Sequence, residues 1–209
     1  MLIILNMHPR NSSAPAKQLA WQIIFLHVHD CVELFLKISK IIHMEATFKG
    51  NPVRLSGELP AKGTKAPAFT LTGKSLNDIS LEDLRGKRVV LNIFPSLDTD
   101  VCAASVRRFN KEAAELHNTV VLCVSEDLPF AAARFCTVNG IENVSTASGF
   151  RSDFGKEYGV VIEEGPLRGL YARALVVIDE NSKVIGTSLC KEITEEPDYE
   201  FAISLLKQA

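Results

Sequence analysis

The sequence predicts one α/β domain with a central mixed sheet flanked by helices, and three observations support this prediction. The first is an alternation of strand and helix patterns, at 89–94, about 100–116, 120–124 and about 128–138. The second is a hairpin pattern, in which strands at 175–178 and 184–186 flank the turn residues 179–182. The third is a closing helix over 197–207. Because alternating strands and helices form parallel pairs, we expect a βαβ unit followed by an antiparallel hairpin and a final helix.

Smaller elements lie on either side of the βαβ unit. Before it, turn residues and short apolar runs predict a hairpin around Gly50-Asn51-Pro52, a strand at 69–71 and a helical turn at 80–84. After it, we expect a short strand near Val144 and a helix over about 153–158. In the first helix, apolar residues at roughly helical spacing predict a stripe that faces the core, formed by Val101, Ala104, Phe109, Ala113 and Leu116.

Composition limits the classes of function. The chain has 209 residues, of which 46% are hydrophobic and 23% charged, as in an ordinary globular protein with one core. The net charge is −2 and no run of Lys or Arg is present, so nothing favours binding to nucleic acid or to an anionic membrane.

Residues 1–43 differ from the rest, and we expect an N-terminal extension there and the domain itself at 44–209. The apolar stretch 21–42 contains charged and His residues, so it lacks the roughly 18 uncharged residues of a membrane span. It also lacks the pattern of a secretory signal. Three interpretations remain: an amphipathic interfacial helix, a weak targeting segment, or an upstream extension that results from a mis-assigned start codon. The extension could also be weakly ordered. We favour the third, because Met44 directly precedes the predicted N-terminal hairpin.

The cysteines indicate a reducing compartment, which we take to be the cytoplasm. There are five, an odd number at wide spacing: Cys31, Cys102, Cys123, Cys136 and Cys190. This pattern does not suggest a disulfide scaffold, and no C-x-x-C or Cys/His cluster suggests zinc. Transient disulfide chemistry fits it better.

Cys102 has the most informative position. It follows the apolar strand 89–94 and falls in the first turn of the helix that we expect from about residue 100. If Thr99 is the N-cap and its hydroxyl accepts a bond from the first turn, then Cys102 is the third helical residue. The unpaired N–H groups there favour an anion, and the thiolate is the nucleophilic form of cysteine. The alternative is an inert buried thiol.

The residues around Cys102 resemble those of a known family. Pro95, Thr99 and Cys102 match the Pro-x-x-x-Thr-x-x-Cys signature of peroxiredoxins. The longer string 92–107 and the opening 47–53 are similar to the bacterial thiol peroxidase subfamily, the atypical 2-Cys peroxiredoxins. The resemblance covers nearly all of 44–209. It implies a thioredoxin-like fold with an added N-terminal β-hairpin.

The resemblance also implies a site that reduces hydrogen peroxide and organic hydroperoxides. Cys102 would be the peroxidatic nucleophile and become a sulfenic acid. Pro95 would shield the thiolate, and Thr99 would hydrogen-bond the sulfur and the peroxide. Arg173, in an otherwise apolar run, would complete the site and polarise the peroxide bond. From spacing alone, each has a structural alternative: Pro95 ends the strand, Thr99 only caps the helix, and Arg173 points to water.

Cys136, 34 positions after Cys102, matches the resolving cysteine of the subfamily, which would form an intramolecular disulfide. The alternative is a small apolar filler of the second helix. The resemblance further implies thioredoxin as reductant, a homodimer whose interface includes the active-site face, and no metal or organic cofactor. We expect Cys123 to be a core residue, and Cys190 has no implied role.

Asp100 departs from the family's pattern, in which this position often carries a small or uncharged residue. Together with Asp98 it places two carboxylates in the first turn, which stabilise the helix but repel a thiolate. Arg107, Arg108 or Arg173 would offset that repulsion. Two rival functions remain open. One is a peroxide sensor or redox binding module on the same fold, and the other is a one-cysteine peroxidase in which Cys136 is structural.

Overall fold

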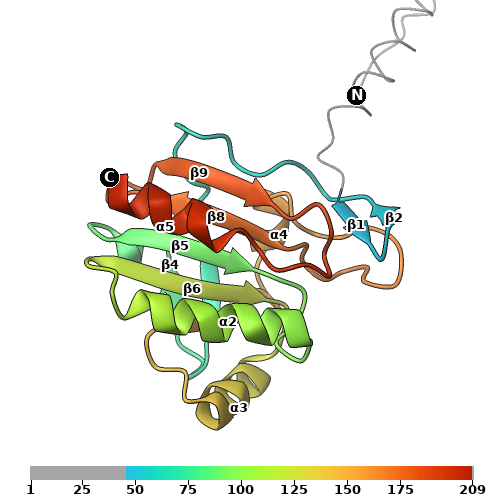
Figure 1. Cartoon of the computed structure of the whole chain (residues 1–209), viewed down its shortest axis with the longest axis horizontal. Coiled ribbons are helices and arrows are strands. Elements are labelled where there is room, and N and C mark those ends of the chain that lie inside the picture. Colours follow the sequence, from blue (N-terminus) through green and yellow to red (C-terminus); the bar gives the residue numbers. More distant parts are fainter. Residues whose placement is uncertain (1–45, 209) are drawn as a thin grey trace, which may run out of the picture. The chain divides into compact units, whose positions relative to one another are not determined.

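A seven-stranded sheet of order β4-β3-β7-β6-β5-β8-β9 forms the centre of the chain (Figure 1). The computed structural model describes residues 46–208, and the expectations for 1–43 and Cys31 lie outside this part. The elements are β1 (Ala46–Phe48), β2 (Asn51–Val53), β3 (Thr70–Gly73), β4 (Asp78–Ser80), η1 (Glu82–Leu84), β5 (Arg88–Ile93), α2 (Asp100–Ala113), β6 (Thr119–Ser125), α3 (Pro129–Asn139), β7 (Ser145–Ser148), α4 (Phe154–Glu157), β8 (Ala174–Ile178), β9 (Val184–Leu189) and α5 (Tyr199–Gln208).

The strand directions confirm the predicted architecture. β5 pairs in parallel with β6, from Arg88 opposite Thr119 to Ile93 opposite Val124, and β6 pairs in parallel with β7. β8 lies antiparallel to β5 on its other side and forms the predicted hairpin with β9. The sheet is therefore mixed, and the carboxyl ends of β5, β6 and β7 meet at one edge.

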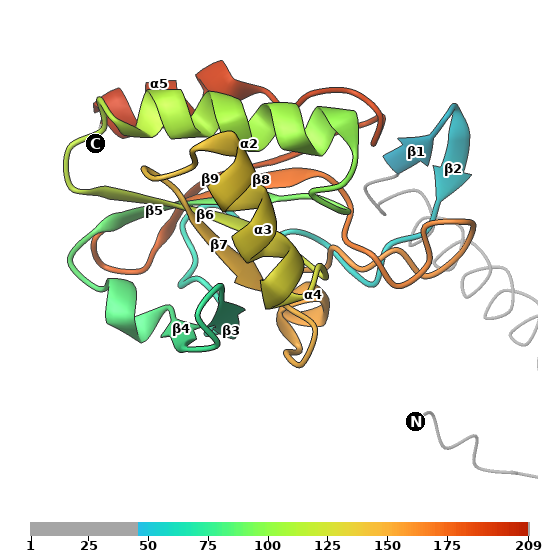
Figure 2. The same ribbon diagram turned by 90° about the horizontal axis from the view of Figure 1, so that it is seen from below.

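Alternate residues of β5 pack into two apolar layers on opposite faces of the sheet. Val89, Leu91 and Ile93 belong to a layer that also holds the aromatic side chains of α4 and its surroundings. Val90 and Phe94 belong to the second layer, which α2, α3 and α5 cover. Figure 2 shows α2 and α5 on the same side of the sheet. Burial on both faces explains why the apolar residues of β5 occur at successive positions, apart from Asn92, rather than in alternation.

The first helix differs from the prediction in two respects. It ends at Ala113, and only residues 114 and 115 continue it, as a turn. Its buried face consists of Cys102, Ala103, Ser105, Val106 and Phe109, whereas Val101 and Ala104 are only half-buried. The predicted stripe was wrong at these two positions, because Cys102 and Ser105 turn inward to make polar contacts that an apolar pattern does not detect.

The predicted N-terminal hairpin is confirmed as β1 and β2. Ala46 pairs with Val53 and Phe48 with Asn51, and the turn residues Lys49 and Gly50 have φ of 52° and 77°. Positive φ at both central residues is typical of the tight hairpin turn. Figure 1 shows this hairpin at the end of the sheet toward which β5 and β6 point. The sequence pattern did not predict β4, which pairs with β3.

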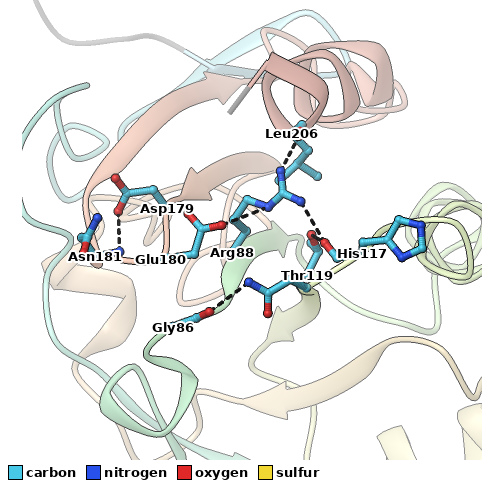
Figure 3. A network of polar contacts seen from close by, with 9 residues as sticks. Gly86, Arg88, His117, Thr119, Asp179, Glu180, Asn181 and Leu206 are labelled. Carbon is cyan, nitrogen blue, oxygen red and sulfur yellow. Dashed lines mark hydrogen bonds and ion pairs between the residues drawn. The ribbon is translucent and has the colours of Figure 1, made fainter.

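At the opposite end of the sheet, Arg88 joins four parts of the fold (Figure 3). Its Nη1 donates to the carbonyl of Leu206 in α5, and its Nη2 donates to the carbonyl of His117 at 2.9 Å. Its Nε lies 3.5 Å from a carboxylate oxygen of Glu180 in the β8–β9 turn. Arg88 thus ties the closing helix to the start of β5.

Within residues 46–208, no helix has the length and apolar content to cross a membrane.

Candidate active site

Cys102 lies where the second apolar layer meets the edge formed by the carboxyl ends of the parallel strands. After β5 come the buried residues Phe94 and Pro95, and then a short loop leads into α2. Thr99 is the N-cap, with an extended backbone (φ −107°, ψ 143°), so Cys102 is the third helical residue as predicted. Its side chain is fully buried. Cys102 thus belongs to the first turn, whose N–H groups have no partner within the helix.

The Thr99 hydroxyl does not cap α2, and this corrects the expectation. It donates instead to the carbonyl of Ser96, at 3.0 Å, and no side-chain bond to the first turn is formed. Threonine hydroxyls compete in this way for nearby carbonyls in turns. The side chain lies on the exposed side of the loop. Thr99 thus fixes the start of α2 through its backbone, while its hydroxyl holds the loop before it.

Arg173 directly contacts the sulfur of Cys102. It precedes β8 and is 1% exposed, so it does not point to water. Its Nη2 lies 3.3 Å from Cys102 Sγ. Nε and Nη2 also donate to the carbonyl of Ile193, at 3.1 and 3.0 Å. The remaining nitrogen, Nη1, is buried and has no partner among the described residues. A guanidinium in this position stabilises negative charge on the sulfur and keeps one donor free.

The carboxylates of Asp98 and Asp100 are exposed, so solvent screens their repulsion of the sulfur. Of the three arginines named above as able to offset this repulsion, only Arg173 faces Cys102. Arg107 donates to the side-chain oxygen of Asn139 at 3.4 Å. Arg108 lies over the ring of Tyr199 in α5, 4.2 Å from its centroid.

Asp127, which the sequence pattern did not single out, clamps the loop before α2. It accepts bonds from Ser96 Oγ at 2.7 Å, from Leu97 N at 2.6 Å and from Ser125 Oγ at 2.8 Å. Ser125 ends β6, so the carboxylate joins the ends of two neighbouring parallel strands. A signal was available: polar residues directly after an apolar strand lie at the edge where ligands bind.

A second polar link runs behind the site. The Asn92 side chain of β5 donates to Ser105 Oγ at 3.2 Å, and Ser105 Oγ donates to the carbonyl of Cys102 at 2.8 Å. Asn92 also lies 3.6 Å from the sulfur of Cys123. Cys123 is a core residue, as predicted, and burial raises the pKa of its thiol to about 12. This thiol therefore stays protonated at neutral pH.

Cys136 lies in α3, and its thiol is not bonded to Cys102. All four described cysteines are free thiols. Cys136 is 5% exposed, and its Sγ lies 3.7 Å from Thr146 Oγ1 of β7. β7 and β8 are separated in the sheet by β6 and β5. At about 4.8 Å per strand, the strand that contacts Cys136 and the strand that Arg173 precedes are about 14 Å apart. The structure does not bring Cys136 to the Cys102–Arg173 pair.

Within residues 46–208, no group of three or more His, Cys, Asp or Glu side chains converges as a metal site would require. The side chains of the site supply a thiol, that of Cys102, next to a buried cation, that of Arg173.

Comparisons with known proteins show the family to which this chain is similar. The Redoxin family model matches residues 61–203, a range that includes every site residue from Asn92 to Ile193. The thiol peroxidase of Corynebacterium glutamicum is 54% identical over 159 residues, which cover 76% of this chain and 96% of that protein. The thiol peroxidase of Mycobacterium bovis is 56% identical over 162 residues, which cover 78% and 98%. A peroxiredoxin-like protein from Aquifex aeolicus, solved by crystallography, has a TM-score of 0.76 and 39% identity over 79% of this chain and 96% of its own.

The Asp127 clamp predicts that Asp127→Ala lowers the free energy of unfolding by about 1–3 kcal/mol, because three donors lose a charged acceptor. Urea unfolding measures this, and hydrogen exchange at the Leu97 amide should accelerate. Asp98→Ala is the matched control, since its exposed carboxylate makes no such bonds. Equal effects of the two substitutions would contradict the clamp.

The buried Cys123 thiol predicts a pH dependence. The unfolded chain releases this proton at a pH of about 8.5, whereas the folded protein holds it to about 12. The stability that Cys123 contributes is therefore complete below the lower value and is lost as pH rises toward the upper one. At pH 9, iodoacetamide should leave Cys123 unmodified in the folded protein and alkylate it in urea, as peptide mass mapping would show. Rapid alkylation in the folded state would refute this.

Proposed function

The chain belongs to the thiol peroxidases of the redoxin family, and from this premise we propose that it reduces hydrogen peroxide and organic hydroperoxides with Cys102 as nucleophile. One observation carries the proposal: Arg173, almost without exposure, has Nη2 3.3 Å from Cys102 Sγ and leaves Nη1 unpaired. A buried cation with a spare donor beside a thiol is suited to an anionic nucleophile and to a polar substrate oxygen. The biological role would be antioxidant defence.

In the first step, the Cys102 thiolate attacks the terminal oxygen of the hydroperoxide. The sulfur–oxygen bond forms as the oxygen–oxygen bond breaks, and the leaving oxygen takes a proton to become water or an alcohol. Cys102 becomes a sulfenic acid. Arg173 would stabilise the thiolate before the attack and the charge on the leaving oxygen during it. The Thr99 hydroxyl would turn from Ser96 to the substrate, and buried Pro95 would exclude water.

In the second step, the Cys136 thiolate attacks the sulfenic sulfur, hydroxide leaves as water after protonation, and a disulfide forms. Cα atoms more than about 7 Å apart cannot be bridged without backbone movement. The Cys136 thiol contacts β7 and the Cys102 thiol contacts the residue before β8, so resolution would require α3 or the start of α2 to unwind. α3 buries only Pro129, Ala132 and Cys136, so its opening is the less costly of the two. Thioredoxin would then reduce the disulfide with its own dithiol.

The apolar surface at the same edge supports the proposed homodimer. Three large apolar side chains are exposed on the segments that follow β6 and β7, namely Leu128 at 50%, Phe130 at 65% and Phe150 at 43%. Since β5, β6 and β7 are parallel, these segments lie at the edge that carries Cys102. Exposed apolar side chains gathered in this way mark protein interfaces. The four free thiols support a cytoplasmic location, where thiols stay reduced.

Steady-state reduction of hydrogen peroxide with thioredoxin tests the roles of the cysteines. Cys102→Ser should lower turnover at least about a thousandfold, equivalent to about 4 kcal/mol of activation free energy, because the nucleophile is removed. Cys136→Ser should still consume one peroxide per chain but should not turn over with thioredoxin. Cys190→Ser, a change at a thiol outside the proposed cycle, should be close to wild type.

Other results would support the rival functions. Undiminished turnover by Cys102→Ser would end the central claim. Full turnover by Cys136→Ser, with only Cys102 oxidised on peptide mapping, would favour the one-cysteine mechanism. An oxidised wild-type protein that no dithiol reductant recycles would favour a sensor.

The dimer proposal predicts that Phe130→Glu shifts the protein from dimer to monomer, because it places a charge at the most exposed of the three apolar side chains Leu128, Phe130 and Phe150. Sedimentation velocity measures the mass of each species. Val138→Glu is the control, since Val138 is also exposed on α3 but lies near the other end of that helix. A wild-type protein that sediments as a monomer at micromolar concentration would contradict the proposal.

A further inference from the structure

Glu192 lies in the loop that follows β9, between the N-terminal hairpin and the backbone that holds Arg173. We propose that Glu192 is a positioning residue, which acts through Ile193 to hold the Arg173 guanidinium against Cys102. This inference rests on the proposed function, because it concerns the reactivity of Cys102. The N-terminal hairpin would thereby help to position Arg173, although no residue of the hairpin makes a polar contact with Cys102 or Arg173.

The Glu192 carboxylate is bound on both oxygens. Five donors reach it: Lys49 N at 3.1 Å, Thr194 N at 3.0 Å and Thr194 Oγ1 at 2.7 Å on Oε1, and Gly50 N at 2.9 Å and Thr47 Oγ1 at 2.8 Å on Oε2. The bonds from the Gly50 and Thr194 backbones hold the pKa of Glu192 well below its ordinary value. The side chain is therefore ionised at neutral pH and serves as an acceptor for both the hairpin turn and its own loop.

The peptide units on either side of Glu192 are also fixed to the hairpin. Thr47 N donates to the carbonyl of Lys191 at 2.6 Å, and Ile193 N donates to the carbonyl of Thr47 at 2.8 Å. The buried side chain of Ile193 packs with Ala46 and Val53 of the hairpin. Main-chain bonds, carboxylate bonds and apolar packing thus set the position of residue 193 together.

The position of the Ile193 carbonyl in turn determines the position of the Arg173 guanidinium. Its carbonyl accepts from both Nε and Nη2 of Arg173, and the same Nη2 lies 3.3 Å from Cys102 Sγ. Among residues 46–208, no carboxylate forms an ion pair with Arg173, so this carbonyl is the fixed acceptor that orients the guanidinium. If the loop after β9 relaxes, the carbonyl moves, and the guanidinium loses its alignment with the sulfur.

The experiment compares Glu192→Gln with Glu195→Gln in the full chain. Glu195 lies in the same segment, is exposed, and makes no side-chain hydrogen bond among the described residues. The measured quantity is the rate constant at which hydrogen peroxide oxidises Cys102, by rapid quench and peptide mass mapping. We expect at least about a tenfold loss in Glu192→Gln, because an amide presents N–H groups to backbone donors. Glu195→Gln should stay within about twofold of wild type.

A double-mutant cycle separates positioning from a general structural effect. In an Arg173→Gln background, Glu192→Gln should change the rate constant by less than about twofold, because the group that it positions is gone. The loss of thermal stability caused by Glu192→Gln should be similar in both backgrounds. Rate losses that multiply independently, or an unchanged rate in the single variant, would overturn the inference.

A milder variant covers the case in which Glu192→Gln does not fold. Thr194→Val removes one bond to Oε1 and keeps the carboxylate, and it should give a smaller loss of the same kind that also disappears in the Arg173→Gln background. The alkylation rate of Cys102 by iodoacetamide repeats the comparison without peroxide. A wild type that does not reduce peroxide would end the proposed function, whereas equal alkylation in the Glu192 and Glu195 variants would end this inference alone.

Discussion

The site depends on the contact between the Arg173 guanidinium and the Cys102 sulfur. A cation that is 1% exposed is costly to bury unless an anion or several acceptors compensate it. Among the described residues, the Arg173 guanidinium contacts one backbone carbonyl and one sulfur, and it contacts no carboxylate. The dependence is reciprocal: the cation favours a charged sulfur, and a charged sulfur reduces the cost of the buried cation. The remaining contacts of the site bring these two groups together from different parts of the chain.

The sheet explains why such distant residues meet. β5 and β6 are parallel, so the loops after them leave from one edge, and Asp127 joins these loops through Ser96 and Ser125. β8 is antiparallel to β5, so the residue that precedes β8 lies at this same edge, and that residue is Arg173. One edge therefore receives the start of α2 and the start of β8. The directions of the strands thus bring Cys102 and Arg173 together without a dedicated subdomain.

The sequence predicted the secondary-structure elements and the position of Cys102 better than it predicted the contacts between side chains. β5 and the hairpin β8–β9 were predictable because continuous or alternating apolar runs reflect burial, and the place of Cys102 followed from the helix start. β4 was missed because Asp78-Ile79-Ser80 has one apolar residue and depends on pairing with β3. The Thr99 hydroxyl went to a local carbonyl, a choice that spacing does not decide. Glu192 bonds residues more than 140 positions away, so only the folded chain could reveal it.

The same buried pair affects the step after oxidation in the proposed cycle. In that cycle Cys102 reacts as a thiolate, and its oxidation to a neutral sulfenic acid would remove the anion that compensates Arg173 while the guanidinium stays buried and charged. The folded arrangement then loses a favourable interaction that a locally opened one never had. Oxidation would thus lower the free energy needed to open the site, and the proposed attack by Cys136 needs such opening, since its sulfur contacts Thr146 in β7. In the proposed cycle, the contact that prepares the thiol for peroxide would therefore also link the opening of the helices to the oxidised state.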